Sequence, residues 1–239
     1  MTTFLPIITT LSGSSLLACD WKHIGVHALS LRLDSLLVKP GIELLTQLRD
    51  LGAYVGWDET IVLSASHLKK SNTGVYRIRS TFDGRISTYT EDELLHVIRQ
   101  LNPAYFVVPS VTWADALADT AIRLIVPEHE NTMKYEGVWR KLDQESTLFI
   151  DGTQIWQETE KPISLAVSGL IYTDDDEILD IKQAHMAQIF RPLVAGCACE
   201  ACETNLTVSY FHHLFTQTPG LCQRFLIQHN VANYPTIKL

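Results

Sequence analysis

Apolar and polar positions along this chain follow a rhythm that predicts alternating strands and helices. Residues 61–63 and 105–108 are short apolar runs of the kind that forms buried strands. Between them, residues 91–101 carry apolar side chains at helical spacing and begin with acidic residues, which stabilise the positive end of a helix. A strand, a helix and a further strand in this order indicate an α/β fold with parallel strands.

Turn residues divide the remaining pattern into further elements. Asp83-Gly84 separates two β-prone runs, 75–80 and 85–89, and therefore predicts a hairpin. The other predicted elements are, in chain order, a strand entering a helix at 24–37, a helix at 42–51, a helix at 115–123, a strand at 124–126, an irregular segment at 127–141 and a strand at 148–150.

Two short helices are predicted near the end of the chain. Apolar residues recur at helical spacing over 208–215, with Thr204 or Asn205 as the cap of this first helix. A Thr-Pro-Gly break then ends the helix. Thr218 can cap the second helix, with Pro219 at its first position, where proline is well tolerated.

Three of the five cysteines lie close together before these helices, at Cys197, Cys199 and Cys202. Thiolates at this spacing can surround one ion, and Zn²⁺ is commonly held in a tetrahedron by three cysteines and one histidine. The alternative is a group of buried cysteines that packs beside the helix pair. We predict a structural zinc ion.

The fourth ligand has to come from a more distant part of the chain. Cys222 and His229 share one face of the second predicted helix, so both point roughly the same way. His229 is the preferred ligand, and Cys222 is the alternative. His212 and His213, on the first helix, are not excluded by their spacing.

The composition is that of a globular protein, with 46% hydrophobic and 19% charged residues in a chain of 239, enough for one large domain or two small ones. A net charge of -8 argues against tight RNA binding by this chain alone, because phosphate contacts require Lys and Arg. Cys19 and Cys222 are far apart, which indicates reduced thiols. No basic segment introduces a signal peptide, and no apolar run is long enough to span a membrane. We predict a cytoplasmic protein without a membrane partner.

The region around the cysteines resembles the C-terminal zinc region of the tRNA-guanine transglycosylases. That family carries F-x-P-L, C-x-C-x-x-C, Y-x-H-H-L and H-N in this order, and the same patterns occur here at 190–193, 197–202, 210–214 and 229–230. The resemblance implies that Cys197, Cys199, Cys202 and His229 are the zinc ligands.

Two earlier segments resemble the same family. One is a Pro-Gly-x-Glu helix start followed by Gly-Trp-Asp, at 40–43 and 56–58; the other is Arg-Ser-x-x-Asp-Gly at 79–84. The resemblance implies a (β/α)₈ TIM-barrel-like fold with a C-terminal zinc-binding helical module. The chain is too short between residues 141 and 179 for every usual barrel element, so the barrel is shortened or incomplete. We place the barrel-like body at 1–180 and the zinc module at 181–239.

The family exchanges a guanine base in tRNA for a 7-deazaguanine by means of aspartates. One attacks the ribose, a second acts as acid and base, and a third reads the purine edge, because an oxocarbenium-like centre needs an ionised oxygen beside it. Here Ser64 stands where the resemblance implies the acid/base aspartate. The strand at 105–108 is followed by no carboxylate before Asp115. The catalytic carboxylates are therefore predicted to be lost.

The remaining carboxylates that could be repurposed are Asp151, which follows a predicted strand, and Asp174, which begins an acidic run. Barrel active sites lie at strand ends, which makes both weak catalytic candidates. The alternative is that both are solvated loop residues. A Ser64–His67 pair is not expected, because residues three apart at a strand end point to different faces.

Basic residues are concentrated on the predicted hairpin, at Arg77, Arg79 and Arg85. These arginines are weak candidates for nucleic-acid contacts, and ordinary solvated charges are the alternative. The segment 203–209, between the cysteines and the first helix, holds no lysine or arginine, which argues against phosphate binding there.

The preferred hypothesis is a catalytically degenerate accessory or structural subunit in tRNA base modification. It would form a homodimer, or a heterodimer with a catalytic transglycosylase subunit, and would meet tRNA through that complex. Tyr210 and Phe211 are expected to be exposed and to suit such an interface.

Two other functions remain open. The first is an active base exchange on tRNA or another nucleic acid. The second is a protein that binds a deazapurine without chemistry, in which Trp57, Trp113 or Tyr105 could stack on the ring. The alternative, and the commoner fate of such residues, is burial in the core.

Overall fold

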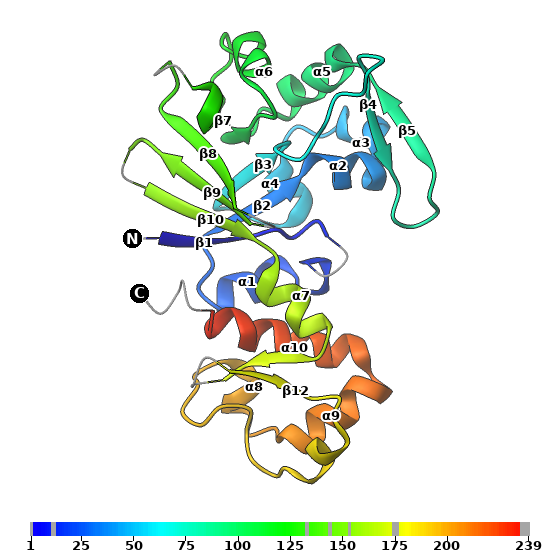
Figure 1. Ribbon diagram of the computed structural model, residues 1–239, viewed down its shortest axis with the longest axis vertical. Helices are drawn as coiled ribbons and strands as arrows, with labels where there is room; N and C mark the ends of the chain where they lie inside the picture. The colour runs from blue at the N-terminus through cyan, green and yellow to red at the C-terminus, as the bar shows by residue number, and fades with distance from the viewer. Residues whose placement is uncertain are drawn as a thin grey trace.

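The computed structural model describes residues 2–10, 13–131, 134–142, 145–152, 154–173 and 177–234. Its centre is an eight-stranded sheet that curls into a barrel (Figure 1). Around the sheet the strands are, in spatial order, β1 (Thr2–Pro6), β10 (Gln154–Thr159), β9 (Glu145–Ile150), β8 (Gly137–Leu142), β7 (Arg123–Pro127), β6 (Tyr105–Val107), β3 (Thr60–Ser64) and β2 (Ala28–Arg32).

The barrel nearly closes where β1 meets β2. A parallel bridge joins Ile7 to Ser30, and the amide of Ile8 donates a 3.0 Å hydrogen bond to the carbonyl of Ser30. The amide of Arg32 donates to the Thr9 hydroxyl at 2.8 Å. The predicted TIM-barrel-like α/β fold is confirmed.

One strand of the barrel runs against the others. β9 is antiparallel to β8 and to β10, whereas every other pairing in the barrel is parallel. The three strands form a meander, and no helix occurs in the described residues between them. A parallel crossover needs a dozen or more residues, and a hairpin needs only a few. The meander is how a chain that is short in this region completes the sheet, and the expectation of parallel strands is wrong for β9.

Short helices and one hairpin connect the parallel strands. The segments before β10 are η1 (Gly13–Ser15), α1 (Ala18–His23), α2 (Leu33–Leu36), η2 (Leu37–Gly41), α3 (Ile42–Leu45), α4 (Leu51–Val55), the hairpin β4 (Tyr76–Arg79) and β5 (Ile86–Tyr89), α5 (Glu91–Leu101), α6 (Val111–Ala116) and η3 (Glu128–Glu130). The predicted hairpin and the helix at 91–101 are confirmed. In α5, Thr90 and Glu93 form a reciprocal capping box, and a buried apolar stripe faces the barrel.

Two predicted elements are displaced. The helix expected at 115–123 occurs earlier, as α6, because Trp113 and Ala114 are the residues that bury against the sheet. The segment expected to be irregular at 127–141 contains β8, in which Trp139 points into the barrel and donates to the carbonyl of Val108 at 2.9 Å. Contacts from distant strands decide both positions.

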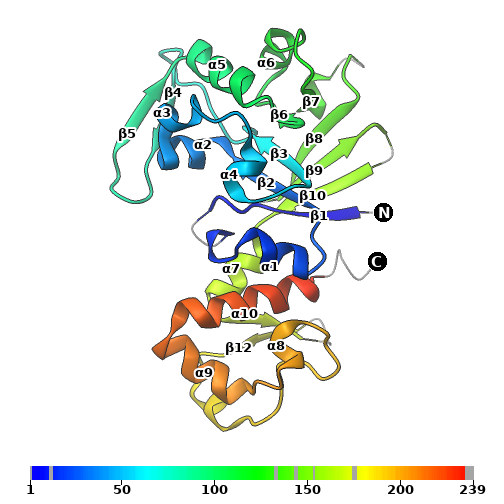
Figure 2. The same cartoon turned by 180° about the vertical axis from the view of Figure 1, so that it is seen from behind.

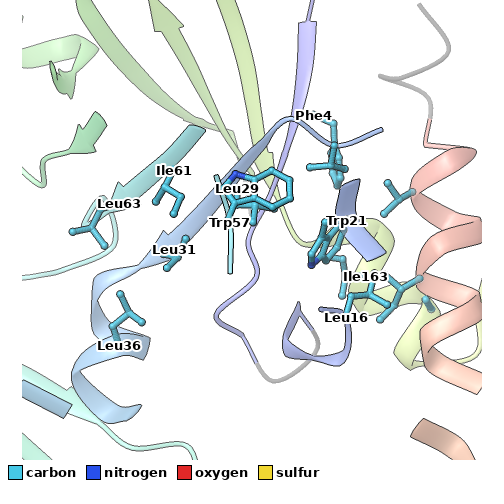
Figure 3. Packing of buried hydrophobic residues seen from close by; sticks show 14 of the residues in the cluster. Phe4, Leu16, Trp21, Leu29, Leu31, Leu36, Trp57, Ile61, Leu63 and Ile163 are labelled. Carbon is cyan, nitrogen blue, oxygen red and sulfur yellow. The ribbon is translucent and has the colours of Figure 1, made fainter. Parts of the chain in front are cut away.

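Two apolar clusters hold the body together. One fills the barrel and includes Trp139 and Trp156. The other lies between the barrel and its helices. Figure 3 shows Leu29 and Leu31 of β2 and Ile61 and Leu63 of β3 in this second cluster, which extends to Trp21 of α1.

The C-terminal part of the chain forms a separate helical end beyond α1 (Figures 1 and 2). It consists of α7 (Lys161–Val167), the hairpin β11 (Leu170–Tyr172) and β12 (Ile178–Asp180), η4 (Ala184–Gln188), α8 (Glu200–Glu203), α9 (Val208–Gln217) and α10 (Pro219–Ala232). The boundary placed at residues 180 and 181 stays a prediction. In the part of the chain that the structure describes, no helix is both long and apolar enough to cross a membrane.

A buried carboxylate ties the helical end to the barrel. Asp20 of α1 accepts hydrogen bonds from the Arg224 guanidinium of α10 at 2.7 Å and from the Leu17 amide at 3.0 Å. Its side chain is only 7% exposed. Because this carboxylate of α1 pairs with a side chain of α10, the contact anchors α10 against α1.

We predict that Asp20→Ala lowers the free energy of unfolding by ~1–3 kcal/mol, because it leaves partly buried donors unpaired. Denaturant titration followed by circular dichroism measures the change. Asp58→Ala is the matched control: it removes another carboxylate that pairs with a cation, Lys22, but this one is 78% exposed and its loss should leave stability unchanged. Equal effects of the two variants would refute the anchoring role.

Candidate metal centre

Three cysteines and one histidine converge within the helical end. The ligand atoms of Cys197, Cys199, Cys202 and His229 all lie within 4.8 Å of one another. The His229 Nδ1 is 3.9, 3.3 and 3.4 Å from the three sulfur atoms in that order. Around a tetrahedral ion with bonds of ~2.3 Å to sulfur and ~2.0 Å to nitrogen, such distances are about 3.5 Å. The four side chains therefore form a Cys₃His group that fits a metal ion.

A tight turn brings the three sulfurs together. Gly196 adopts a left-handed φ of 77° just before the first cysteine. Cys199 then occupies the N-cap position of α8, and the amide of Cys202 donates to its carbonyl at 3.0 Å. Cys199 and Cys202 are buried, whereas Cys197 is partly exposed. The turn thus presents one sulfur from the outside of the group and two from within.

The imidazole of His229 is fixed from both sides. Its Nε2 lies 3.0 Å from the carbonyl oxygen of Tyr172 in β11, so this nitrogen carries the hydrogen and donates it. The Nδ1 lone pair is then directed at the sulfurs. Hydrogen bonding of the outer nitrogen to a carbonyl is the usual way in which a protein selects the tautomer of a metal-binding histidine.

The next residue, Asn230, supports the same strand. Its side-chain oxygen accepts from the Tyr172 amide at 3.1 Å, and its Nδ2 donates to the carbonyls of Leu170 and Pro162 at 2.9 and 3.0 Å. His229 and Asn230 therefore make different contacts, although they are adjacent in the chain. The histidine faces the sulfurs, and the asparagine holds the strand that orients the histidine.

Protonation is strongly perturbed within the group. Hydrogen bonds from the Cys199 and Cys202 thiols lower the pKa of Cys197, and the same contacts raise the pKa of Cys199. Burial opposes protonation of His229, but its hydrogen bonds to Cys197 and Cys202 outweigh burial and raise its pKa to about 9. The raised pKa of His229 favours a proton on its imidazole, and a metal ion has to displace that proton.

The alternative ligands are engaged elsewhere. Cys222 is buried and its thiol donates to the carbonyl of Phe211 at 3.5 Å, while burial raises its pKa to about 12. The Nδ1 of His212 lies 2.7 Å from the carbonyl of Ile181. His213 stacks on Tyr210, with ring centroids 6.3 Å apart. The position of His229, and not that of Cys222, completes the group.

At the C-terminal mouth of the barrel, where its parallel strands end, a serine stands where the resemblance implies the acid/base aspartate. Ser64 ends β3, is fully buried and lies 3.2 Å from the Ser66 hydroxyl. His67 turns away from Ser64, and its Nε2 contacts Oδ1 of Asp34 at 2.6 Å. As expected from the sequence, Ser64 and His67 do not form a pair.

Asp34 is a carboxylate at this mouth that the sequence pattern did not single out. The Arg32 guanidinium donates two hydrogen bonds to its carboxylate, at 3.2 and 2.9 Å. Burial raises the pKa of Asp34, but contacts with His67 and Arg32 outweigh burial and lower the pKa to about 2. Asp34 and Glu160 both line a cavity of about 530 Å³. The only sign of this residue in the sequence is a carboxylate two residues after the strand that ends at Arg32.

Asp151 lies at the opposite mouth. It follows β9, and because this strand is antiparallel, its end is at the N-terminal mouth of the barrel. There Asp151 lines a cavity of about 330 Å³ with Tyr105 and Arg123. The expectation that a strand end places Asp151 where barrel active sites lie is therefore not met. Asp174 lies outside the described residues.

The aromatic residues considered for ring stacking are engaged in packing. Trp57 and Trp113 are 3% and 0% exposed, and their indole nitrogens donate to the Thr60 carbonyl and the Tyr76 hydroxyl. Neither is free to stack on a ligand, and the expectation is wrong for both. Tyr105 faces the N-terminal mouth.

The structure also shows which of the predicted interface and hairpin side chains are exposed. Phe211 is fully buried, so its expected exposure is wrong, because α9 turns this side chain into the core; Tyr210 is 45% exposed. Arg77 and Arg79 lie exposed on β4, and Arg85 is exposed just before β5.

Comparison with known proteins finds similarity in the C-terminal part of the chain. Residues 158–237 match a family model described as queuine tRNA-ribosyltransferase. Queuine tRNA-ribosyltransferase accessory subunit 2 of Ixodes scapularis is 39% identical over 61 residues, which cover 26% of this chain and 15% of that protein. The proteins of the same name from Danio rerio and Homo sapiens are 36% identical over 56 residues, or 23% of this chain and 13% of theirs. The alignments thus span a small part of these relatives. Residues 158–237, which hold all four side chains of the Cys₃His group, are therefore the part of the chain that is similar to the queuine tRNA-ribosyltransferase family.

Proposed function

We propose that this chain is a non-catalytic accessory subunit in tRNA base modification. One contrast carries the proposal: the structure has a Cys₃His group, whereas Ser64, at the end of β3, stands where the resemblance implies the acid/base carboxylate. Base displacement needs an ionised oxygen beside the anomeric carbon, and a buried serine hydroxyl does not supply one. The name of the relatives, accessory subunit 2, supports the same assignment.

The metal we assign to the Cys₃His group is zinc. Three thiolates and one imidazole suit the borderline-soft Zn²⁺ ion, and four protein ligands fill its coordination shell. A zinc ion bound here would cross-link the turn that begins α8 to α10 and would stabilise the fold without a role in chemistry. We propose residues 181–239 as the module that this ion stabilises.

The partner we assign is a catalytic subunit of the same family, bound through the helical end. Phe190, Tyr210 and Leu221 are 78%, 45% and 45% exposed there. Aromatic and aliphatic side chains of this kind are enriched at the core of protein interfaces. A second copy of this chain is the alternative occupant, and tRNA would be reached through the complex.

Base exchange by this chain itself is a second candidate, and one observation favours it. Asp34 and Glu160 line the same cavity at the C-terminal mouth, where barrel enzymes hold their catalytic groups. Against it, Asp34 is already paired with the Arg32 guanidinium and in contact with the His67 ring. The accessory function is therefore preferred.

Zinc content tests the ligand assignment. We expect about one zinc ion per chain in the purified protein, and its loss in Cys202→Ser, because three remaining ligands bind zinc weakly. Cys222→Ser is the control, since it removes another buried thiol from the helical end and should keep the metal. Elemental analysis of both variants measures the outcome, and zinc loss only in the control would overturn the assignment.

The pH dependence of zinc binding follows from the pKa of His229. Below a pKa of about 9 the free imidazole is protonated, so zinc has to release this proton. The apparent affinity should therefore rise with pH, about tenfold per pH unit for each proton displaced. Competition with a chromophoric chelator from about pH 6.5 to about pH 8.5 gives the slope. An affinity that is constant over this interval would contradict the assignment.

Reconstitution tests the accessory function. We expect this chain to co-elute with a catalytic queuine tRNA-ribosyltransferase subunit and to raise incorporation of labelled guanine into tRNA. Tyr210→Asp should weaken the complex at least about tenfold by placing a charge in an apolar contact. Phe82→Asp is the matched control, since it changes an aromatic residue of similar exposure, 53%, at the far end of the molecule.

The same experiment separates the two candidate functions. The chain alone should give no incorporation. Incorporation by the chain alone that is abolished in Asp34→Asn would instead establish base exchange at the barrel mouth.

A further inference from the structure

One of the three sulfur ligands differs from the others in its surroundings. Cys199 and Cys202 are each 5% exposed, whereas Cys197 is the partly exposed member of the group. Its sulfur is therefore the one that solvent, chelators and oxidants reach first.

A side chain next to the group donates a hydrogen bond to this sulfur. The Nδ2 of Asn233 lies 3.1 Å from the Cys197 sulfur and 2.9 Å from the carbonyl oxygen of His229. An amide nitrogen has two hydrogens, and both are thus assigned. The orientation of the amide is fixed by these partners, since a thiolate and a carbonyl both accept and would repel the side-chain oxygen.

The position of Asn233 makes this contact specific. It is the C-cap residue of α10, lies one turn after His229 and is 8% exposed. Asn233 thereby connects the histidine and the outermost cysteine of the group. Of the side chains that the structure describes outside the group itself, it is the one that donates a hydrogen bond to a sulfur of the cluster.

We propose that Asn233 is a positioning residue for the metal centre, which holds the Cys197 thiolate in place and slows its loss from the ion. The inference rests on the zinc binding proposed above. An amide that donates to the sulfur restrains its position and reduces its reaction with electrophiles. A carboxylate of the same shape would face the thiolate with a like charge. Partners that support metal ligands in this way typically contribute 10–100-fold to affinity.

The experiment compares Asn233→Asp and Asn233→Ala with the wild-type protein, each loaded with zinc. A chromophoric chelator in excess reports the rate of zinc release by absorbance. We expect release to be about 10–100-fold faster in Asn233→Asp and several-fold faster in Asn233→Ala. Asn205→Asp is the matched control, because it makes the same charge change near the cysteines without a contact to sulfur, and its release rate should equal that of the wild type.

A second readout separates this inference from a general loss of structure. Brief alkylation with iodoacetamide, followed by peptide mass spectrometry, gives the rate at each cysteine. In Asn233→Ala the reactivity of Cys197 should increase more than that of Cys199 and Cys202. Equal increases at all three cysteines, or wild-type zinc release in both variants, would overturn the inference. If the wild-type protein binds no zinc, the metal assignment itself fails, and the two failures are thus distinguishable.

Discussion

The imidazole of His229 is the contact on which the helical end depends. One ring nitrogen faces three sulfurs, and the other is hydrogen-bonded to the backbone of β11. A shift of this ring would therefore disturb the cysteine turn and the β11–β12 hairpin together. Small modules have too little apolar surface to stabilise themselves by burial alone, and a metal cross-link replaces part of the missing core. The buried amide of Asn230 and the Asp20–Arg224 ion pair then fix this unit against α7 and α1.

The meander in the barrel links the short chain to the proposed loss of catalysis. A barrel enzyme draws its catalytic groups from the loops that follow its parallel strands at one mouth. Replacing crossovers by the hairpins of β8, β9 and β10 completes the sheet with few residues, but it removes such loops and directs the end of β9 to the other mouth. Asp151 is carried there by the direction of its strand. The direction of β9 thus accounts for the absence of Asp151 from the C-terminal mouth.

The features that could be predicted from the sequence are those set by neighbouring residues. The helix α5 follows from its capping residues and apolar stripe, and the β4–β5 hairpin follows from Asp83-Gly84 between β-prone runs. The cysteine cluster was evident because its spacing is itself the signal. Choosing His229 as the fourth member depended on the family pattern, since helical spacing also allowed Cys222.

The features that escaped prediction are set by contacts between distant residues. The reversed direction of β9 depends on which strands it pairs with, and α6 begins where Trp113 meets the core. Asn233 looks like an ordinary helix end until the fold brings it against Cys197, 36 residues earlier in the chain. No local pattern carries information of this kind.

The barrel mouth shows why a carboxylate in a cavity is not by itself a catalytic group. A general acid needs a proton to donate at neutral pH, and a pKa of about 2 leaves Asp34 without one. A nucleophile needs an oxygen free to approach a carbon atom, and Arg32 and His67 occupy both oxygens of this carboxylate. The same contacts that stabilise the ionised form connect the ends of β2 and β3. Asp34 is therefore best understood as part of the frame of the barrel mouth, which agrees with the accessory function proposed above.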